Sequence, residues 1–137
     1  MSDLIRRADA TRKTLAKYRR RAFDWRGRST CIHLARYHLR NMGHTPPPVP
    51  DFRSALGARR ALDRLGFADL AALFDSMLPR IAPAAMLVGD LAVLQGDEGF
   101  DSIVVSAGGK LLGYHADDGS GIKPLMALEM PVGAWRL

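Results

Sequence analysis

The feature that most constrains the fold is a change in the spacing of apolar residues near Pro83. Before Pro83, apolar residues recur three and four positions apart, which is typical of helices that bury one face. After it, the apolar runs are short and are separated by glycine and aspartate, as in strands joined by turns. Helices followed by an antiparallel sheet predict an α+β fold, with the N-terminal helices packed on one face of the C-terminal sheet.

Four helices are expected in the first part of the chain. Ser2 and Asp3 can cap a helix over 3–20. Its thin apolar stripe consists of Leu4, Ile5, Ala8, Leu15, Ala16 and Tyr18. Ser29 or Thr30 caps a second helix that runs to about Met42, and Gly43 stops it. A stiff connector follows, because proline occupies positions 46, 47, 48 and 50. The third and fourth helices are expected over 52–66 and 68–78.

Strands are expected over 86–95, 101–107 and 110–116, and the ranges 121–123 and 133–137 can add one or two more. The glycines between these runs indicate hairpin turns, since no helix follows them as a phosphate-binding loop requires. Asp90 is expected to cap a turn.

The chain has 137 residues, which is enough for one ordinary domain and too few for two. We expect a basic helix over 1–20 and a single α+β domain over 21–137. One cysteine excludes an internal disulfide and a zinc site built on cysteines. No apolar run approaches the ~20 residues of a membrane-spanning helix, and the first residues lack the apolar block of a signal peptide. We therefore expect a soluble protein that is made in the cytoplasm.

The positive charge is concentrated at the N-terminus. Residues 1–40 carry 12 of the 20 lysines and arginines and three aspartates, a balance of +9, whereas the remainder has a balance of −3. This asymmetry predicts a basic face for an acidic partner, a phosphate or a membrane surface, although a solvated helix has the same composition. The residues proposed to bind a partner are Arg6, Arg7, Lys13, Lys17, Arg20 and Arg21. Nucleic-acid binding through this region is an alternative, but the sequence has no recognisable reader motif.

Cys31 is the candidate nucleophile. It falls in the first turn of the second helix, where main-chain N–H groups favour an anion, and Arg26 and Arg28 add positive charge nearby. Each effect lowers the pKa of a thiol and so favours the reactive thiolate. His33 and His38 lie too far around or along the helix to activate it, which leaves His115 as the candidate base. His33 and His38 also diverge too much to share an ion, so no metal or cofactor is expected.

Several short motifs resemble those of a known family. The run FDWRG at 23–27, followed by Cys31 at a helix start, resembles the segment before the nucleophile in NlpC-type cysteine peptidases. These are papain-like peptidoglycan hydrolases, and GDLAV at 89–93 looks like their Gly-Asp-Leu strand opening. More closely, the chain is similar to a phage and prophage tail-module family of unassigned function, whose members share a closing Ala-Trp-Arg, here 134–136. The resemblance covers about residues 20–137 and implies a papain-like fold.

The chain departs from the peptidase pattern at the residues that carry the chemistry. Phe23 stands where those enzymes often have a tyrosine that helps hold the oxyanion, and Thr30 replaces the aspartate before the cysteine. At the position of the catalytic histidine the nearest residues are Asp101 and Ser102, and neither is an imidazole base. A thiol without its base loses both proton transfer and orientation.

These departures predict a pseudoenzyme that serves as a structural or assembly component of a phage tail. Its expected partners are tail-tip, tape-measure or hub proteins, and its expected location is the host cytoplasm and then the virion tail. The alternative is an active thiol hydrolase that cuts peptidoglycan peptides or a phage protein, with Cys31 as nucleophile and His115 as base.

Overall fold

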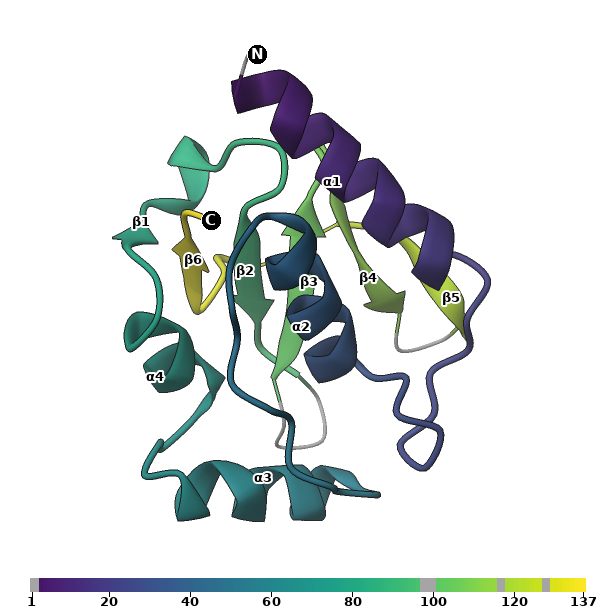
Figure 1. Cartoon of the computed structure of the whole chain (residues 1–137), viewed down its shortest axis with the longest axis vertical. Coiled ribbons are helices and arrows are strands. Elements are labelled where there is room, and N and C mark those ends of the chain that lie inside the picture. The colour runs from purple at the N-terminus through teal and green to yellow at the C-terminus, as the bar shows by residue number, and fades with distance from the viewer. Residues whose placement is uncertain (1–2, 97–100, 116–117, 127–128) are drawn as a thin grey trace.

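The computed structural model describes residues 3–96, 101–115, 118–126 and 129–137 (Figure 1). Within them, four α-helices precede six β-strands, and a single 3-10 turn lies between the first two strands. The helices are α1 (Asp3–Tyr18), α2 (Cys31–Asn41), α3 (Ala55–Arg64) and α4 (Leu70–Asp75). The strands and the 3-10 turn are β1 (Arg80–Ile81), η1 (Pro83–Ala85), β2 (Leu91–Leu94), β3 (Ser102–Ser106), β4 (Leu111–His115), β5 (Asp118–Leu125) and β6 (Gly133–Trp135).

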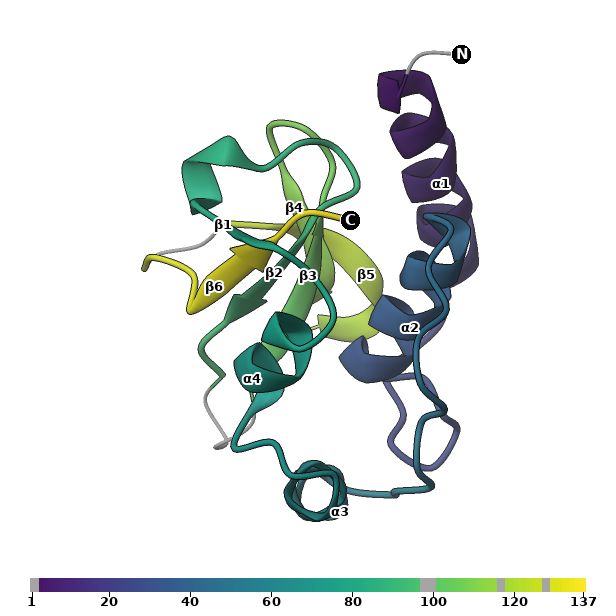
Figure 2. The same ribbon diagram turned by 60° about the vertical axis from the view of Figure 1, so that its left-hand side comes forward.

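All six strands of the described residues form one antiparallel sheet in the order β1-β6-β2-β3-β4-β5. Helices α1 and α2 lie together on one side of this sheet, with α4 near β6 (Figure 2). The chain is therefore an α+β protein, as the sequence predicts, with α1, α2 and α4 on one face of an antiparallel sheet and α3 beyond the end of the sheet (Figure 2).

The side chains that the strands turn toward the helices form the main core. They alternate along each strand, because successive side chains point to opposite faces of a sheet. The fully or almost fully buried ones are Leu91, Val93, Ile103, Val105 and Trp135. Trp135 also fixes α4, because its indole Nε1 donates a hydrogen bond to Asp75 Oδ1 at 2.9 Å and its ring packs against Phe74.

Local signals set the ends of the helices. The Thr30 side chain accepts a hydrogen bond from the Ile32 N–H and so caps α2, and Gly43 follows that helix with a φ of 90°. Gly66 has a φ of 88° after α3, as expected. The predicted ranges of α3 and α4 were too long, because Ser54 and Asp69 cap these helices instead of belonging to them. Strand β1 was not predicted.

The inner face of α1 differs from the predicted apolar stripe. Leu4 and Ile5 are 57% and 54% exposed, so this part of the prediction was wrong. The buried face carries Arg7, Thr11 and Thr14 together with two apolar residues of the core. Burying polar groups costs little here because they are hydrogen-bonded, and every buried side-chain N or O atom of the described residues has a partner.

Candidate functional site

Cys31 occupies the first position of α2 and is 5% exposed. Its thiol donates a long hydrogen bond, 4.0 Å from sulfur to oxygen, to the main-chain oxygen of Asp101, just before β3. The thiol therefore lies between the start of α2 and the start of β3 and is enclosed in the core.

Burial raises the pKa of the Cys31 thiol to about 11, although the main-chain N–H groups of Ile103 in β3 and of Cys31 and Ile32 at the helix start act to lower it. The expectation of a lowered thiol pKa was wrong, because desolvation of the thiolate outweighs the favourable helix terminus. Arg26 and Arg28 are exposed, so solvent screens their charges. At neutral pH the buried group is a thiol, which is a poor nucleophile.

The histidines of α2 have other partners. His38 is fully buried, with Nε2 2.8 Å from the main-chain oxygen of Gly89 and Nδ1 2.7 Å from the hydroxyl of Thr14. Because a carbonyl oxygen only accepts, we assign the proton of neutral His38 to Nε2, so that Nδ1 accepts from Thr14. His33 Nδ1 lies 2.9 Å from the Thr30 hydroxyl. Burial lowers the pKa of each histidine to about 4.

His115, the candidate base, ends β4 and is exposed to solvent. Its neighbour Tyr114 is the residue that reaches the start of α2: its hydroxyl donates to the Arg21 oxygen at 2.9 Å and lies 3.1 Å from the Ser29 hydroxyl. Among the described residues, the hydrogen bond of the Cys31 thiol goes to a carbonyl oxygen and not to an imidazole.

An aromatic wall, formed by Phe23, Trp25, Tyr114 and Phe52, stands beside the start of α2. Phe23 packs edge-on against Trp25 at 5.3 Å and against Tyr114 at 5.2 Å, and Trp25 packs against Phe52 at 5.9 Å. Sequence reasoning missed Tyr114. The apolar residues around Tyr114 in the sequence indicated only a strand. No neighbouring residue indicated that its hydroxyl lies beside Ser29.

The Gly-Asp and Ala-Trp-Arg motifs meet in one buried ion-pair network. Asp90 is fully buried, and its oxygens accept hydrogen bonds from Arg7 Nη1 at 2.8 Å and Arg136 Nε at 2.9 Å. The same carboxylate accepts the N–H groups of Leu87 and Leu137. Asp90 thus caps a turn, as predicted. It also links Arg7 of α1 to β2, which begins at the next residue, and to Arg136 and Leu137 at the end of the described chain. Both motifs are explained by stabilisation of the fold.

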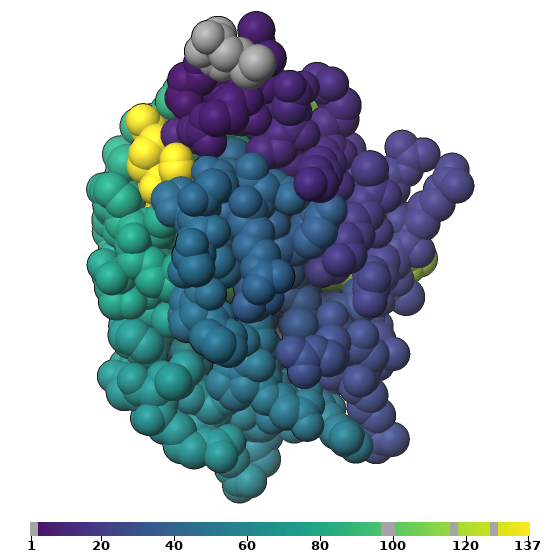
Figure 3. Space-filling view, in the orientation of Figure 1, coloured from purple at the N-terminus to yellow at the C-terminus, as the bar shows by residue number. Residues whose placement is uncertain are grey.

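The basic face predicted from the sequence loses one member and keeps five. Arg7 is 3% exposed and is bound to Asp90, so the expectation that it faces a partner was wrong. The other five residues are exposed: Arg6, Lys13, Lys17, Arg20 and Arg21. Figure 3 shows α1 lying across this side of the molecule, with the residues after it projecting beside it. Arg6 is bound to Asp3 and to the main-chain oxygen of Met42, so we call the exposed surface of the other four, Lys13, Lys17, Arg20 and Arg21, the basic face.

In the part of the chain that the structure describes, no three His, Cys, Asp or Glu side chains come together as a metal-binding group. No helix among the same residues combines the length and the apolar character needed to cross a membrane.

Comparison with known families gives one match. A family model described as "Domain of unknown function (DUF6950)" matches residues 5–137. The chain belongs to this family. The DUF6950 match begins within α1, so the basic helix is part of the family domain and not an appendage to it. The packing agrees, because Ala10 and Tyr18 of α1 belong to the same core as the strands. No curated protein sequence matches the chain.

Proposed function

We propose that this protein is a non-catalytic structural or assembly component of a bacteriophage or prophage tail, built on a degenerate papain-like fold and located at the tail tip. The observation that carries the proposal is the state of Cys31, which is buried, hydrogen-bonded to a carbonyl oxygen and raised in pKa to about 11. A nucleophilic thiol needs an accessible sulfur and a proton acceptor within hydrogen-bond reach. Cys31 is instead a packed core residue whose hydrogen bond goes to a carbonyl oxygen.

The role of the motifs also supports a structural function. Gly89 and Asp90 connect α1, α2 and the sheet through His38, Arg7 and Arg136. These contacts hold α1 in place, and the basic face stays available on its outer side. Tail-tip, tape-measure or hub proteins with an acidic surface are the proposed partners, since opposite charge favours such association. The protein would be made in the host cytoplasm and then incorporated into the tail.

The test is genetic and uses the phage or prophage that encodes the chain. Deleting the gene should abolish complete tails, whereas Cys31→Ala should leave the yield of infectious particles unchanged. The double variant Lys13→Glu/Lys17→Glu should lower that yield at least tenfold, because it reverses the charge of the basic face. The matched control is Arg53→Glu/Arg60→Glu, which makes the same charge change at two exposed arginines in the α3 region.

Mass spectrometry of purified tails should detect the chain. The proposal is wrong if the deletion strain makes normal tails that lack the protein. It is also wrong if a folded Cys31→Ala protein fails to support infection, because that result would assign the thiol an active role in hydrolysis.

A further inference from the structure

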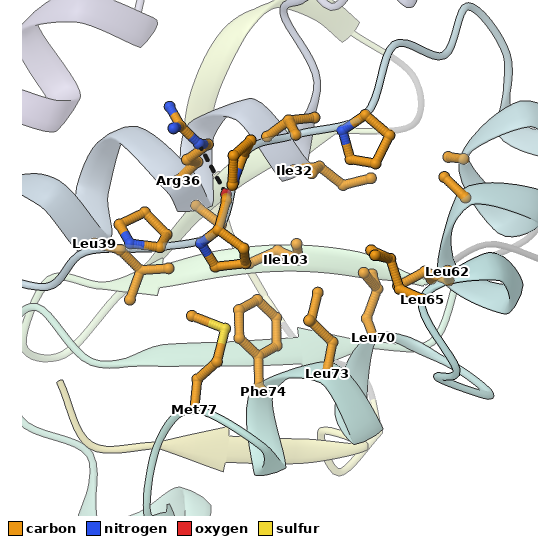
Figure 4. Close-up of a pocket in the computed structure, with 18 of the residues that line it drawn as sticks. Ile32, Arg36, Leu39, Leu62, Leu65, Leu70, Leu73, Phe74, Met77 and Ile103 are labelled. Carbon is orange, nitrogen blue, oxygen red and sulfur yellow. Dashed lines mark hydrogen bonds between the residues drawn. The ribbon is translucent and has the colours of Figure 1, made fainter.

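An open apolar pocket lies between α2, the proline-rich connector, α3 and α4 (Figure 4). It holds about 620 Å³ of space, counted to its open mouth. Leu70, Leu73 and Phe74 of α4, together with Met77 just after that helix, point into it from one side, and Ile103 of β3 lies behind them. A concave surface of this apolar composition is a typical binding site for an apolar group.

The mouth of the pocket is apolar and is flanked by positive charge. Leu65 lines the pocket and is 51% exposed, so it forms part of the mouth. Arg36 also lines it, and Arg64 precedes Leu65 in the chain. The sequence of α3 contains three arginines and one aspartate, Asp63. An occupant with an apolar anchor and a nearby carboxylate complements this surface.

The same chain displays such a segment between β5 and β6. Met126 and Met130 are 86% and 77% exposed, the most exposed large apolar side chains of the described residues, and Val132 is 41% exposed. Glu129 precedes Met130 and is exposed, and Pro131 follows it. Proline restricts the residue before it to extended backbone, so Met130 is presented in a limited set of conformations. Methionine is flexible and fits irregular apolar cavities.

We infer that the pocket of one copy of this protein binds the segment around Glu129 and Met130 of a second copy. Met130 enters the space between α2 and α4, and Glu129 lies near Arg36 at the mouth. This contact is separate from the basic face and does not depend on the proposed tail function. The pocket and the segment are two different patches of the chain, so two copies can exchange both contacts in a closed dimer, or share one contact and leave a free pocket and a free segment for further association.

The first experiment measures the mass of the purified protein by sedimentation equilibrium from ~1 μM to ~1 mM, since contacts of limited area are weak. The wild-type mass should rise with concentration to at least that of a dimer. Met130→Asp removes the anchor, and Leu65→Glu adds a carboxylate at the mouth that repels Glu129. Both residues are exposed, so the variants should fold, which circular dichroism checks. Each variant should associate at least tenfold more weakly, whereas Ile5→Asp, at another exposed apolar residue, should behave as wild type.

The second experiment mixes the two variants. Met130→Asp retains a working pocket and Leu65→Glu retains a working segment, so a 1:1 mixture should form a heterodimer that grows no further. The inference is overturned by a protein that stays monomeric at ~1 mM, or by association that both variants leave intact. It is also overturned by a mixture that remains monomeric, or by native mass spectrometry that finds a small apolar molecule retained in the pocket.

Discussion

Lowering the pH should destabilise the fold through His38, which is fully buried between α1 and the loop before β2. Its pKa is lowered to about 4, first by burial and further by the charges of Arg7 and His44, while the Gly89 oxygen and Asp90 act in the opposite direction. In the unfolded chain a histidine titrates near 6.5. Between these values the unfolded state binds more protons than the folded state, so the free energy of unfolding falls as the pH falls.

The size of the effect follows from the two pKa values. His38 contributes fully above pH 6.5, and its contribution is lost progressively as the pH approaches 4. At about 1.4 kcal/mol per pKa unit, the loss between pH 7.5 and pH 5 is about 2 kcal/mol, and it reaches about 3 kcal/mol near pH 4. That is a large fraction of the stability of a domain of this size.

The measurement is urea unfolding followed by tryptophan fluorescence at several pH values between 7.5 and 4.5. His38→Gln should be less stable than wild type at pH 7.5, because it disturbs the bonds to Thr14 and Gly89. Its stability should then depend less on pH, by up to ~1.4 kcal/mol per pH unit between pH 5 and 6. Arg53→Gln, at an exposed arginine, is the matched control and should keep the wild-type slope. Parallel profiles for wild type and His38→Gln would refute the reasoning.

Three further predictions concern the core. Cys31 should react with a thiol-directed disulfide reagent at pH 7.5 at least ~100-fold more slowly in the folded protein than in urea. The raised pKa of the thiol alone lowers the thiolate fraction by about that factor. Equal rates in the two states would contradict the burial of Cys31. Asp90→Asn should lower the free energy of unfolding by about 3–5 kcal/mol, because it leaves two arginines without their buried carboxylate. Asp9→Asn, at an exposed ion pair, should cost less than about 1 kcal/mol, and similar losses for both would be inconsistent with the network. Gly121→Ala should lower the midpoint temperature of thermal unfolding, because a Cβ there would overlap the main-chain oxygen of Arg19 at the end of α1. An unchanged midpoint would show that the end of α1 does not pack closely on β5.

Much of the candidate site could be located from the sequence, but its chemistry could not. The position of Cys31 at the start of α2 follows from the cap at Thr30, which depends on a few neighbouring residues. The pKa of the thiol depends on how completely β3 and the core enclose it, and the sequence indicated the opposite direction. Tyr114 was missed for the same reason, since its contact with Ser29 joins residues 85 positions apart.

The sequence by itself determined the order and type of most of the elements, although not β1 or the cap of α3 at Ser54. The change in apolar spacing near Pro83, the cap at Ser29 or Thr30, and the glycines after α2 and α3 act over a few residues, so they can be read without the fold. Only the tertiary structure decided which face of α1 is buried. That face is polar because Arg7 meets Asp90 and Thr14 meets His38, pairs that are 83 and 24 residues apart. Hydrophobic periodicity assigns burial to apolar side chains, whereas a charged side chain can be buried when a partner elsewhere in the chain offsets the cost of desolvation.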